Sequence, residues 1–193
     1  DIGRWVAGQL IRRARVPLGL ARTLGVLVVV LATFMLIDGV LLRGAYFFTN
    51  QAFSLHDDTT REGTLQPAEP TKSGSPDSHA PWESLGFQGR DFVSRGLDAG
   101  ELSAISGVPA QDPIRVYVGL GAADTPEERA DLVVAELERT GAFDRSVLAL
   151  IPTTGTGWVN PTAAQAMELV HNGDLAMVAW QYSYLPSWIS FLA

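Results

Sequence analysis

Hydrophobic residues gather in one long run near the start of the chain and in three short runs towards its other end. Residues 23–42, TLGVLVVVLATFMLIDGVLL, contain a single charged residue, Asp38. As a helix this run would span about 30 Å, the thickness of the hydrocarbon core of a bilayer. Three aromatic residues follow it, a type enriched where a helix leaves the membrane. The pattern predicts a transmembrane helix over residues 23–42, followed by Tyr46, Phe47 and Phe48 at the interface.

Two other interpretations fit a long apolar run. A helix buried in a soluble core seldom runs this long without a polar break, and the apolar part of a signal peptide usually has about 7–15 residues. The charge pattern then sets an orientation, because five arginines precede the run and one follows it, and arginine is enriched on the cytoplasmic side. We therefore expect a protein of the cell membrane with its N-terminal side in the cytoplasm. Residues 1–22 would be a cytoplasmic or interfacial basic segment, in which residues 3–16 form an interfacial helix or the loop after an earlier transmembrane helix.

A polar stretch follows the apolar run. Residues 54–81, SLHDDTTREGTLQPAEPTKSGSPDSHAP, are rich in Pro, Ser, Thr and Gly and contain two leucines and no aromatic residue. Such a composition cannot bury enough apolar surface to offset the loss of chain entropy. We expect residues 43–81 to be an extracytoplasmic flexible linker, with His56 and His79 as solvated side chains.

The three short apolar runs alternate with helical patterns. Strands are predicted over residues 114–120, 147–151 and 175–180, and the second, apolar throughout, is typical of a central parallel strand covered on both faces. Thr125, Pro126 and Glu128 form the start signal of a helix between the first two strands. This order predicts an α/β fold, a partial doubly wound parallel sheet preceded by a transmembrane helix. Its domain would span residues 82–193, with short helices and turns over residues 82–113.

Charge and composition exclude several functions. Residues 44–193 carry eight basic and nineteen acidic side chains, which argues against nucleic acid as a partner. The chain has no cysteine, so thiolate metal sites and a cysteine nucleophile are absent from it. A dinucleotide fingerprint beginning at Gly119 would need glycine at position 124, where Asp124 stands and would repel a pyrophosphate. We expect no nucleotide and no other cofactor.

Ligands of such sheets bind beyond the carboxyl ends of the strands, where the sequence places residues 119–124, 152–158 and 181–186. Glycines and threonines of the second loop could offer N–H groups and hydroxyls to an anion; a glycine-rich turn with the tryptophan packed on the core is the alternative. The third loop could line a pocket or pack its aromatic rings in the core. The candidate oxyanion and pocket residues are Thr153, Thr154, Gly155, Thr156, Gly157 and Trp158, and the candidate pocket-lining residues are Gln181, Tyr182, Ser183 and Tyr184.

The stretch from Pro113 to Leu192 resembles the start of the catalytic domain of a family of actinobacterial membrane-anchored, α/β-hydrolase-like proteins. The runs TTGTGW at 153–158 and QYSYLPSW at 181–188 are its most specific pieces, and residues 1–50 would correspond to the last part of the family's membrane region. The resemblance implies a serine hydrolase whose nucleophile elbow lies on the next strand, followed by the acid and the histidine. Only the loop at 153–158 would be carried over, as an oxyanion and pocket element.

These observations lead to two hypotheses. No serine of the chain stands in a Gly-x-Ser-x-Gly motif, and the chain starts without methionine and stops within an apolar run. We therefore expect the N-terminal portion of a membrane-anchored serine esterase or acyl hydrolase, with an ester or lipid as the substrate, the bilayer as partner and no catalytic triad within these residues. The alternative is a non-catalytic, membrane-anchored α/β domain for binding or scaffolding.

Overall fold

A computed structural model of the chain describes residues 17–191. The interfacial helix expected over residues 3–16 lies outside the described residues. The chain divides after Thr49 into two units, Asp1–Thr49 and Asn50–Ala193, which are described separately.

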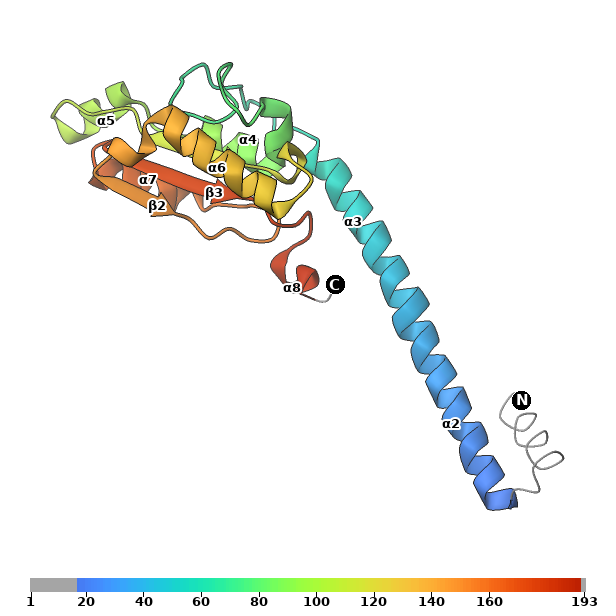
Figure 1. The fold of residues 1–193 in the computed structure, drawn as a ribbon. Helices are drawn as coiled ribbons and strands as arrows, with labels where there is room; N and C mark the ends of the chain where they lie inside the picture. The colour runs from blue at the N-terminus through green and yellow to red at the C-terminus, as the bar shows by residue number, and fades with distance from the viewer. Residues whose placement is uncertain (1–16, 192–193) are drawn as a thin grey trace. The chain divides into compact units, whose positions relative to one another are not determined.

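The described part of the first unit is helical (Figure 1). It contains α2 (Leu18–Leu36), a π-helical turn η1 (Ile37–Leu42) and the start of α3 (Arg43–Asp57). Among the described residues, one helix is long and apolar enough to cross a membrane, and it runs from Arg22 to Asp57. Its apolar side chains are largely exposed, which is unlike a helix in the core of a soluble domain. Helical structure therefore covers the predicted span and continues beyond it.

The second unit is built on a three-stranded parallel sheet (Figure 1). Its strands are β1 (Ile114–Val118), β2 (Val147–Leu150) and β3 (Leu175–Trp180), paired in the order β1-β3-β2. In the register, Val178 of β3 lies opposite Val116 on one side and opposite Leu150 on the other. The α/β fold with a parallel sheet is therefore confirmed, and the strands fall where the sequence predicts them.

The prediction that the second strand is central does not hold for the sheet that residues 17–191 form. Strand β3 lies between its neighbours and is buried over its first five residues, whereas β2 is at the edge and Leu150 is 66 % exposed. The crossover from β1 to β2 skips one position in the sheet, and the chain fills that position only later with β3. An apolar run alone does not distinguish a central strand from an edge strand.

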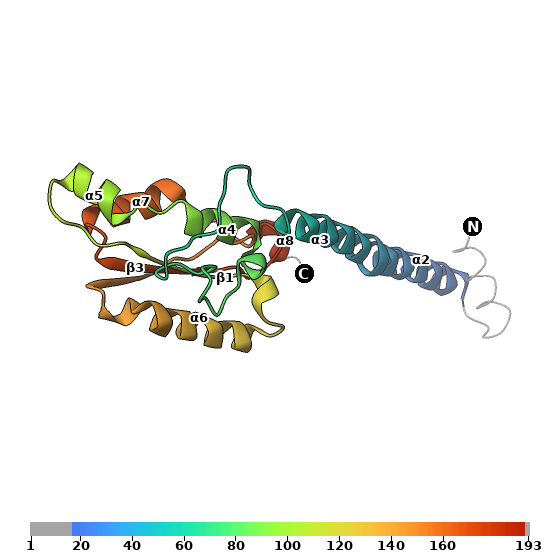
Figure 2. The same ribbon diagram turned by 90° about the horizontal axis from the view of Figure 1, so that it is seen from above.

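Helices cover both faces of the sheet (Figure 2). One face carries α6 (Pro126–Thr140), which begins with the predicted capping box of Thr125 and Glu128 and ends at Gly141 in the left-handed conformation. The opposite face carries helices from both sides of β1 in the sequence. The other elements of this unit are η2 (Trp82–Leu85), α4 (Gly86–Ser94), α5 (Ala99–Ser106), η3 (Leu120–Ala122), η4 (Ala142–Asp144), α7 (Pro161–Val170) and α8 (Ser187–Ser190).

The expectation of a flexible linker over residues 43–81 was wrong in two respects. Residues 43–57 continue the helix as α3, since they contain no proline to end it. Residues 69–81, called the edge strap here, lie along the free edge of β1. Arg115 exchanges backbone hydrogen bonds with Thr71 and Ser73, both of 3.0 Å, in a parallel bridge. The strap thereby satisfies polar groups at the edge of the sheet that would otherwise be open.

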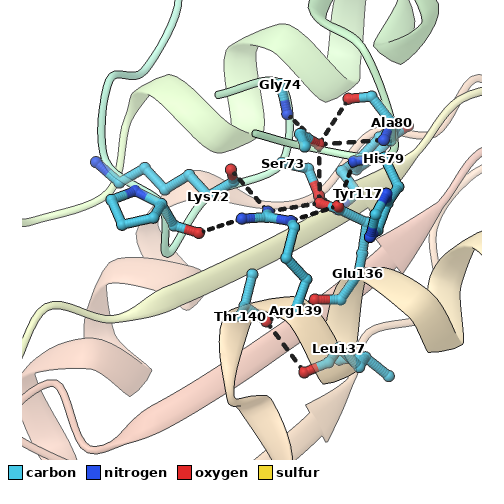
Figure 3. A network of polar contacts seen from close by, with 12 residues as sticks. Lys72, Ser73, Gly74, His79, Ala80, Tyr117, Glu136, Leu137, Arg139 and Thr140 are labelled. Carbon is cyan, nitrogen blue, oxygen red and sulfur yellow. Dashed lines mark hydrogen bonds and ion pairs between the residues drawn. The ribbon is translucent and has the colours of Figure 1, made fainter. Parts of the chain in front are cut away.

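A buried carboxylate fixes the edge strap to α6 (Figure 3). Glu136 is fully buried and accepts hydrogen bonds from Ser73 Oγ at 2.6 Å, Ser78 Oγ at 2.9 Å and the His79 N–H at 2.7 Å. Arg139 adds two bonds to Glu136, at 2.7 and 2.8 Å, and also binds strap carbonyls. Burial alone would raise the pKa of Glu136, but these donors together lower it. Polar groups with partners therefore order this segment, together with the fully buried Ala80.

Candidate functional site

The three loops that follow the strands meet at one edge of the sheet. The Ser183 N–H, after β3, donates to the Gly155 carbonyl, after β2, over 2.9 Å. The Leu120 N–H, after β1, donates to Gln181 Oε1 over 3.3 Å. Parallel strands place their carboxyl ends together, so this meeting follows from the topology. The structure thus brings the two groups of candidate residues into contact; their role in a site stays a prediction.

The loop at residues 153–158 is folded around Thr154. Its carbonyl accepts from the Gly157 N–H at 2.9 Å, and its hydroxyl contacts the Thr156 hydroxyl at 3.0 Å and accepts from the Trp158 N–H at 3.2 Å. Thr153 Oγ1 donates to the carbonyl of Trp180 at the end of β3. These bonds hold the loop in one shape, which a preorganised binding loop requires.

Gly157 holds this loop against the sheet. Its φ of +84° lies in the left-handed region, which residues with a side chain rarely adopt. A Cβ atom built there would stand 1.9 Å from the hydroxyl of Tyr117, which donates to the Gly157 carbonyl over 3.0 Å. Tyr117 is fully buried, and burial raises the pKa of its phenol far above the ordinary value. The phenol therefore stays neutral and serves as a fixed hydrogen-bond donor.

Most N–H groups of this loop already have partners. The Gly155 N–H donates to Ser187 Oγ over 3.0 Å, and those of Gly157 and Trp158 donate to Thr154. Within the described part of the chain, the Thr156 N–H donates no hydrogen bond. An oxyanion needs a donor that is not used inside the protein. Of the residues from Thr154 to Trp158, Thr156 is the one whose N–H meets this condition.

The residues after β3 divide into a buried anchor and a more exposed group. Gln181 is buried, and its amide donates to the Ser183 carbonyl while accepting from Leu120. Tyr182 is 43 % exposed, and its hydroxyl lies 3.0 Å from Ser187 Oγ. Tyr184 is half-buried, and burial raises the pKa of its phenol. Gln181 thus positions the loops, and Tyr182 has a surface available for contact.

Two hollows lie beside these loops. One, of about 410 Å³, is lined by residues of the 152–160 stretch, by one side of α7 and by Ser187. Trp158 is part of its wall and is 42 % exposed, so the alternative of a tryptophan packed in the core is not what the structure shows. The other, of about 400 Å³, lies between α6 and the end of β3 and includes Gln181 and Tyr182. Candidate residues therefore line both hollows.

A carboxylate from the supposed linker also lies near this edge. Asp57, at the end of α3, accepts from the Phe87 N–H over 3.1 Å, and its carbonyl accepts from Arg90 over 2.6 Å. Burial raises the pKa of Asp57 and outweighs the Phe87 hydrogen bond, the Gln181 amide and the Arg90 charge, which lower it. The sequence pattern does not single out Asp57 or Tyr117, because Asp57 stands in an apparent linker and Tyr117 in an apolar strand. The absence of Pro and Gly between residues 45 and 57 is the signal that would have extended the helix.

Comparison with known proteins gives two matches, in different parts of the chain. The family model described as "Alpha/beta-hydrolase family" matches residues 114–193. The model described as "Alpha/beta-hydrolase family N-terminus" matches residues 1–96. No similarity to a curated protein or to a solved structure was found. The two matches cover both the helical first unit and the parallel sheet, and they leave out residues 97–113.

Proposed function

The chain belongs to the α/β-hydrolase family, and from this premise we propose that it is part of a membrane-anchored serine hydrolase that cleaves an ester or acyl substrate. Family membership indicates a hydrolase; the serine nucleophile, the ester substrate and the membrane anchor are parts of the proposal. The observation that carries it is the contact between the loops after β2 and β3, through the 2.9 Å bond from Ser183 to Gly155.

The loop geometry supports a role in stabilising an oxyanion. Acyl transfer passes through a tetrahedral intermediate whose negative oxygen needs preorganised N–H donors. From Thr154 to Trp158, the Thr156 N–H is the donor without a protein acceptor among the described residues, and Thr154 and Gly157 hold it in place. We assign the oxyanion contact to Thr156 and a pocket-forming role to Trp158.

The proposal needs a nucleophile from residues outside this sequence. None of the serines in residues 1–193 stands in a Gly-x-Ser-x-Gly motif, which forms the nucleophile elbow of these enzymes. Ser187 accepts from the Gly155 N–H and contacts the Tyr182 hydroxyl, so it acts as a structural link between loops. We expect a strand added to the open edge of β2 to bring the serine next to the 153–158 loop.

A membrane anchor accounts for the first unit. The helix from Arg22 to Asp57 is largely exposed, and lipid would cover its apolar run, residues 23–42. The single charged residue of that run, Asp38, lies four residues before its end, close to the interface. We place the N-terminal side in the cytoplasm, because five of the six arginines in residues 1–43 precede the apolar run. The α/β unit would then act on the outer surface of the membrane.

Labelling with a fluorophosphonate probe tests the proposal. The full-length protein should be labelled, whereas residues 1–193 alone should not. Thr156→Pro removes the N–H and should lower the labelling rate by roughly 10²-fold, the cost of one oxyanion donor. Thr156→Val keeps the N–H, removes the hydroxyl and should label at nearly the normal rate. Absence of labelling of the folded full-length protein would refute the serine hydrolase.

One observation favours the alternative, a non-catalytic membrane-anchored binding or scaffolding domain. The N–H groups of Gly155, Gly157 and Trp158 are used inside the protein, so the loop offers fewer donors than an open anion site. If the folded full-length protein lacks a reactive serine, the hollows beside the loops would serve binding alone. A ligand that stabilises the protein without being hydrolysed would then support this alternative.

A further inference from the structure

We propose that the hollow between α6 and the end of β3 binds the hydrocarbon chain of a single-chain anionic amphiphile, such as a fatty acid. This inference rests on the proposed function, because it names the class of acyl group that the hydrolase accepts. The hollow has a volume of about 400 Å³, within the range of pockets that hold small organic ligands.

The walls of the hollow are apolar. One wall is the side of α6 that includes Ala130, Val133 and Val134, and the other is formed by Trp180 and Tyr182 at the end of β3. Val134 and Trp180 are 48 % and 40 % exposed, although each has a large hydrophobic side chain. Neighbouring exposed apolar side chains that line a concavity are typical of a ligand site. A hydrocarbon chain gains free energy by covering such a surface.

A cation lies at this hollow. Arg129 is one of its lining residues and donates through Nη1 to the Ala123 carbonyl over 2.8 Å. Among the described residues, no carboxylate lies within 4.0 Å of its guanidinium. A guanidinium can donate two parallel hydrogen bonds to the oxygens of one carboxylate or phosphate. Apolar walls with one cation that lacks an ion pair favour an anionic head group over a neutral or cationic one.

The hollow adjoins the candidate site. Gln181 lines it and also binds Leu120 and Ser183, so the same residue positions the loops and forms the pocket wall. Gln181 additionally packs against Gly157, since a Cβ at that glycine would lie 3.1 Å from the Gln181 side chain. A chain seated beside Trp180 would therefore end close to the loop that holds the Thr156 N–H.

Photo-crosslinking of the whole chain in nanodiscs tests the proposal. The probe is a palmitic acid that carries a diazirine on its chain; after irradiation, trypsin digestion and mass spectrometry locate the label. We expect saturable labelling of the peptide 130–139, which trypsin releases by cutting after Arg129 and Arg139. Unlabelled palmitate should compete with the probe, while hexadecyltrimethylammonium, which has the same chain and a cationic head, should not.

Two variants and a matched control sharpen the test. Ala130→Trp fills the hollow and should abolish labelling of its peptide, while Ala166→Trp places the same ring on the exposed surface of α7 and should leave the labelling unchanged. Arg129→Gln should weaken competition by palmitate roughly tenfold, to the level of hexadecanol, because a charged hydrogen bond is lost. This variant also loses the trypsin site after residue 129, so its labelled peptide begins earlier in the sequence.

Three results would overturn the proposal: labelling that does not saturate, equal labelling of the Ala130→Trp protein, or equal competition by the cationic amphiphile. A second copy of the chain could also cover this face; light scattering that shows a dimer disrupted by Ala130→Trp, without palmitate labelling, would establish that occupant instead. Because the readout is binding, a protein that fails the fluorophosphonate test can still be labelled here, so the failures of the two proposals are distinguishable.

Discussion

The edge strap and the 153–158 loop are both polar and rich in Gly, Ser or Thr, but the structure uses them differently. In the strap, the hydrogen-bonding groups of Ser73, Ser78 and the His79 N–H converge on one buried carboxylate, Glu136. In the loop, the polar groups bond to one another around Thr154 and leave the Thr156 N–H without an acceptor among the described residues.

This difference separates structure from candidate function. A buried polar group whose partners are complete fixes one conformation and has nothing left for a ligand. A preorganised loop with an unused donor and exposed aromatic neighbours can still gain by binding. Composition alone places both segments in the same class, and the partners around Glu136 and around Thr154 distinguish them. The strap hydroxyls of Thr71 and Ser75 lie outside the Glu136 network and have no partner among the described residues.

The largest effect is expected from removal of the buried carboxylate. Glu136→Ala leaves Arg139 and the strap donors without their acceptor in the interior, and should lower the free energy of unfolding by about 3–5 kcal/mol. The exposed Glu138 on the same helix is the matched control, and Glu138→Ala should change it by less than about 0.5 kcal/mol. Urea unfolding of the whole chain in detergent, followed by tryptophan fluorescence, measures both. Equal midpoints for the two variants would show that the strap is not held by Glu136.

A smaller loss is expected at the loop. Gly157→Ala puts a Cβ against the Tyr117 hydroxyl at a left-handed φ and should cost about 2–3 kcal/mol, with loss of fluorophosphonate reactivity in the full-length protein. Gly107 is the matched control, because its φ is +75° and no atom lies within 4 Å of a Cβ built there. Substitution at Gly107 therefore measures the cost of the left-handed conformation without a steric contact. Gly107→Ala should therefore cost only about 1 kcal/mol. If both variants lose the same stability, contact with Tyr117 does not constrain the loop.

The smallest effect is a pH dependence of opposite sign at two carboxylates. The pKa of Glu136 is lower in the folded chain than in the unfolded chain, where it is about 4.3. Glu136 therefore contributes its full stabilisation above about pH 4.3 and loses it as the pH falls through the pKa of the folded state. The pKa of Asp57 is higher in the folded chain than in the unfolded chain, where it is about 3.9. The free energy of unfolding therefore falls as the pH rises from about 3.9 through the pKa of the folded state. Urea midpoints are measured between pH 3 and pH 8. Glu136→Gln should remove the decrease of the midpoint towards acid pH, and Asp57→Asn should remove the decrease of the midpoint as the pH rises. Identical profiles for both variants and the parent chain would contradict this assignment.

Much of the second unit was accessible from sequence patterns. The three strands, the capping box at Thr125 and the loops beyond the strands follow from local rules, because hydrophobic period and turn chemistry depend on neighbours in the sequence. Strand order did not follow, since β2 and β3 are both apolar runs and only pairing assigns the centre to β3. The strap was missed because its order comes from Glu136, more than 50 residues away.

The sequence by itself determined the apolar helix, the parallel α/β class and the loops at 153–158 and 181–184, since each depends on a local pattern that spans a few helical turns or one strand. Only the tertiary structure decided that residues 69–81 close the edge of β1, that Asp57 lies near Gln181, and that an apolar hollow with Arg129 adjoins the loops. These features depend on which groups, distant in the sequence, become partners in the fold. A buried polar group without a hydrogen-bond partner costs free energy, so the tertiary contacts decide whether such a group stabilises the fold.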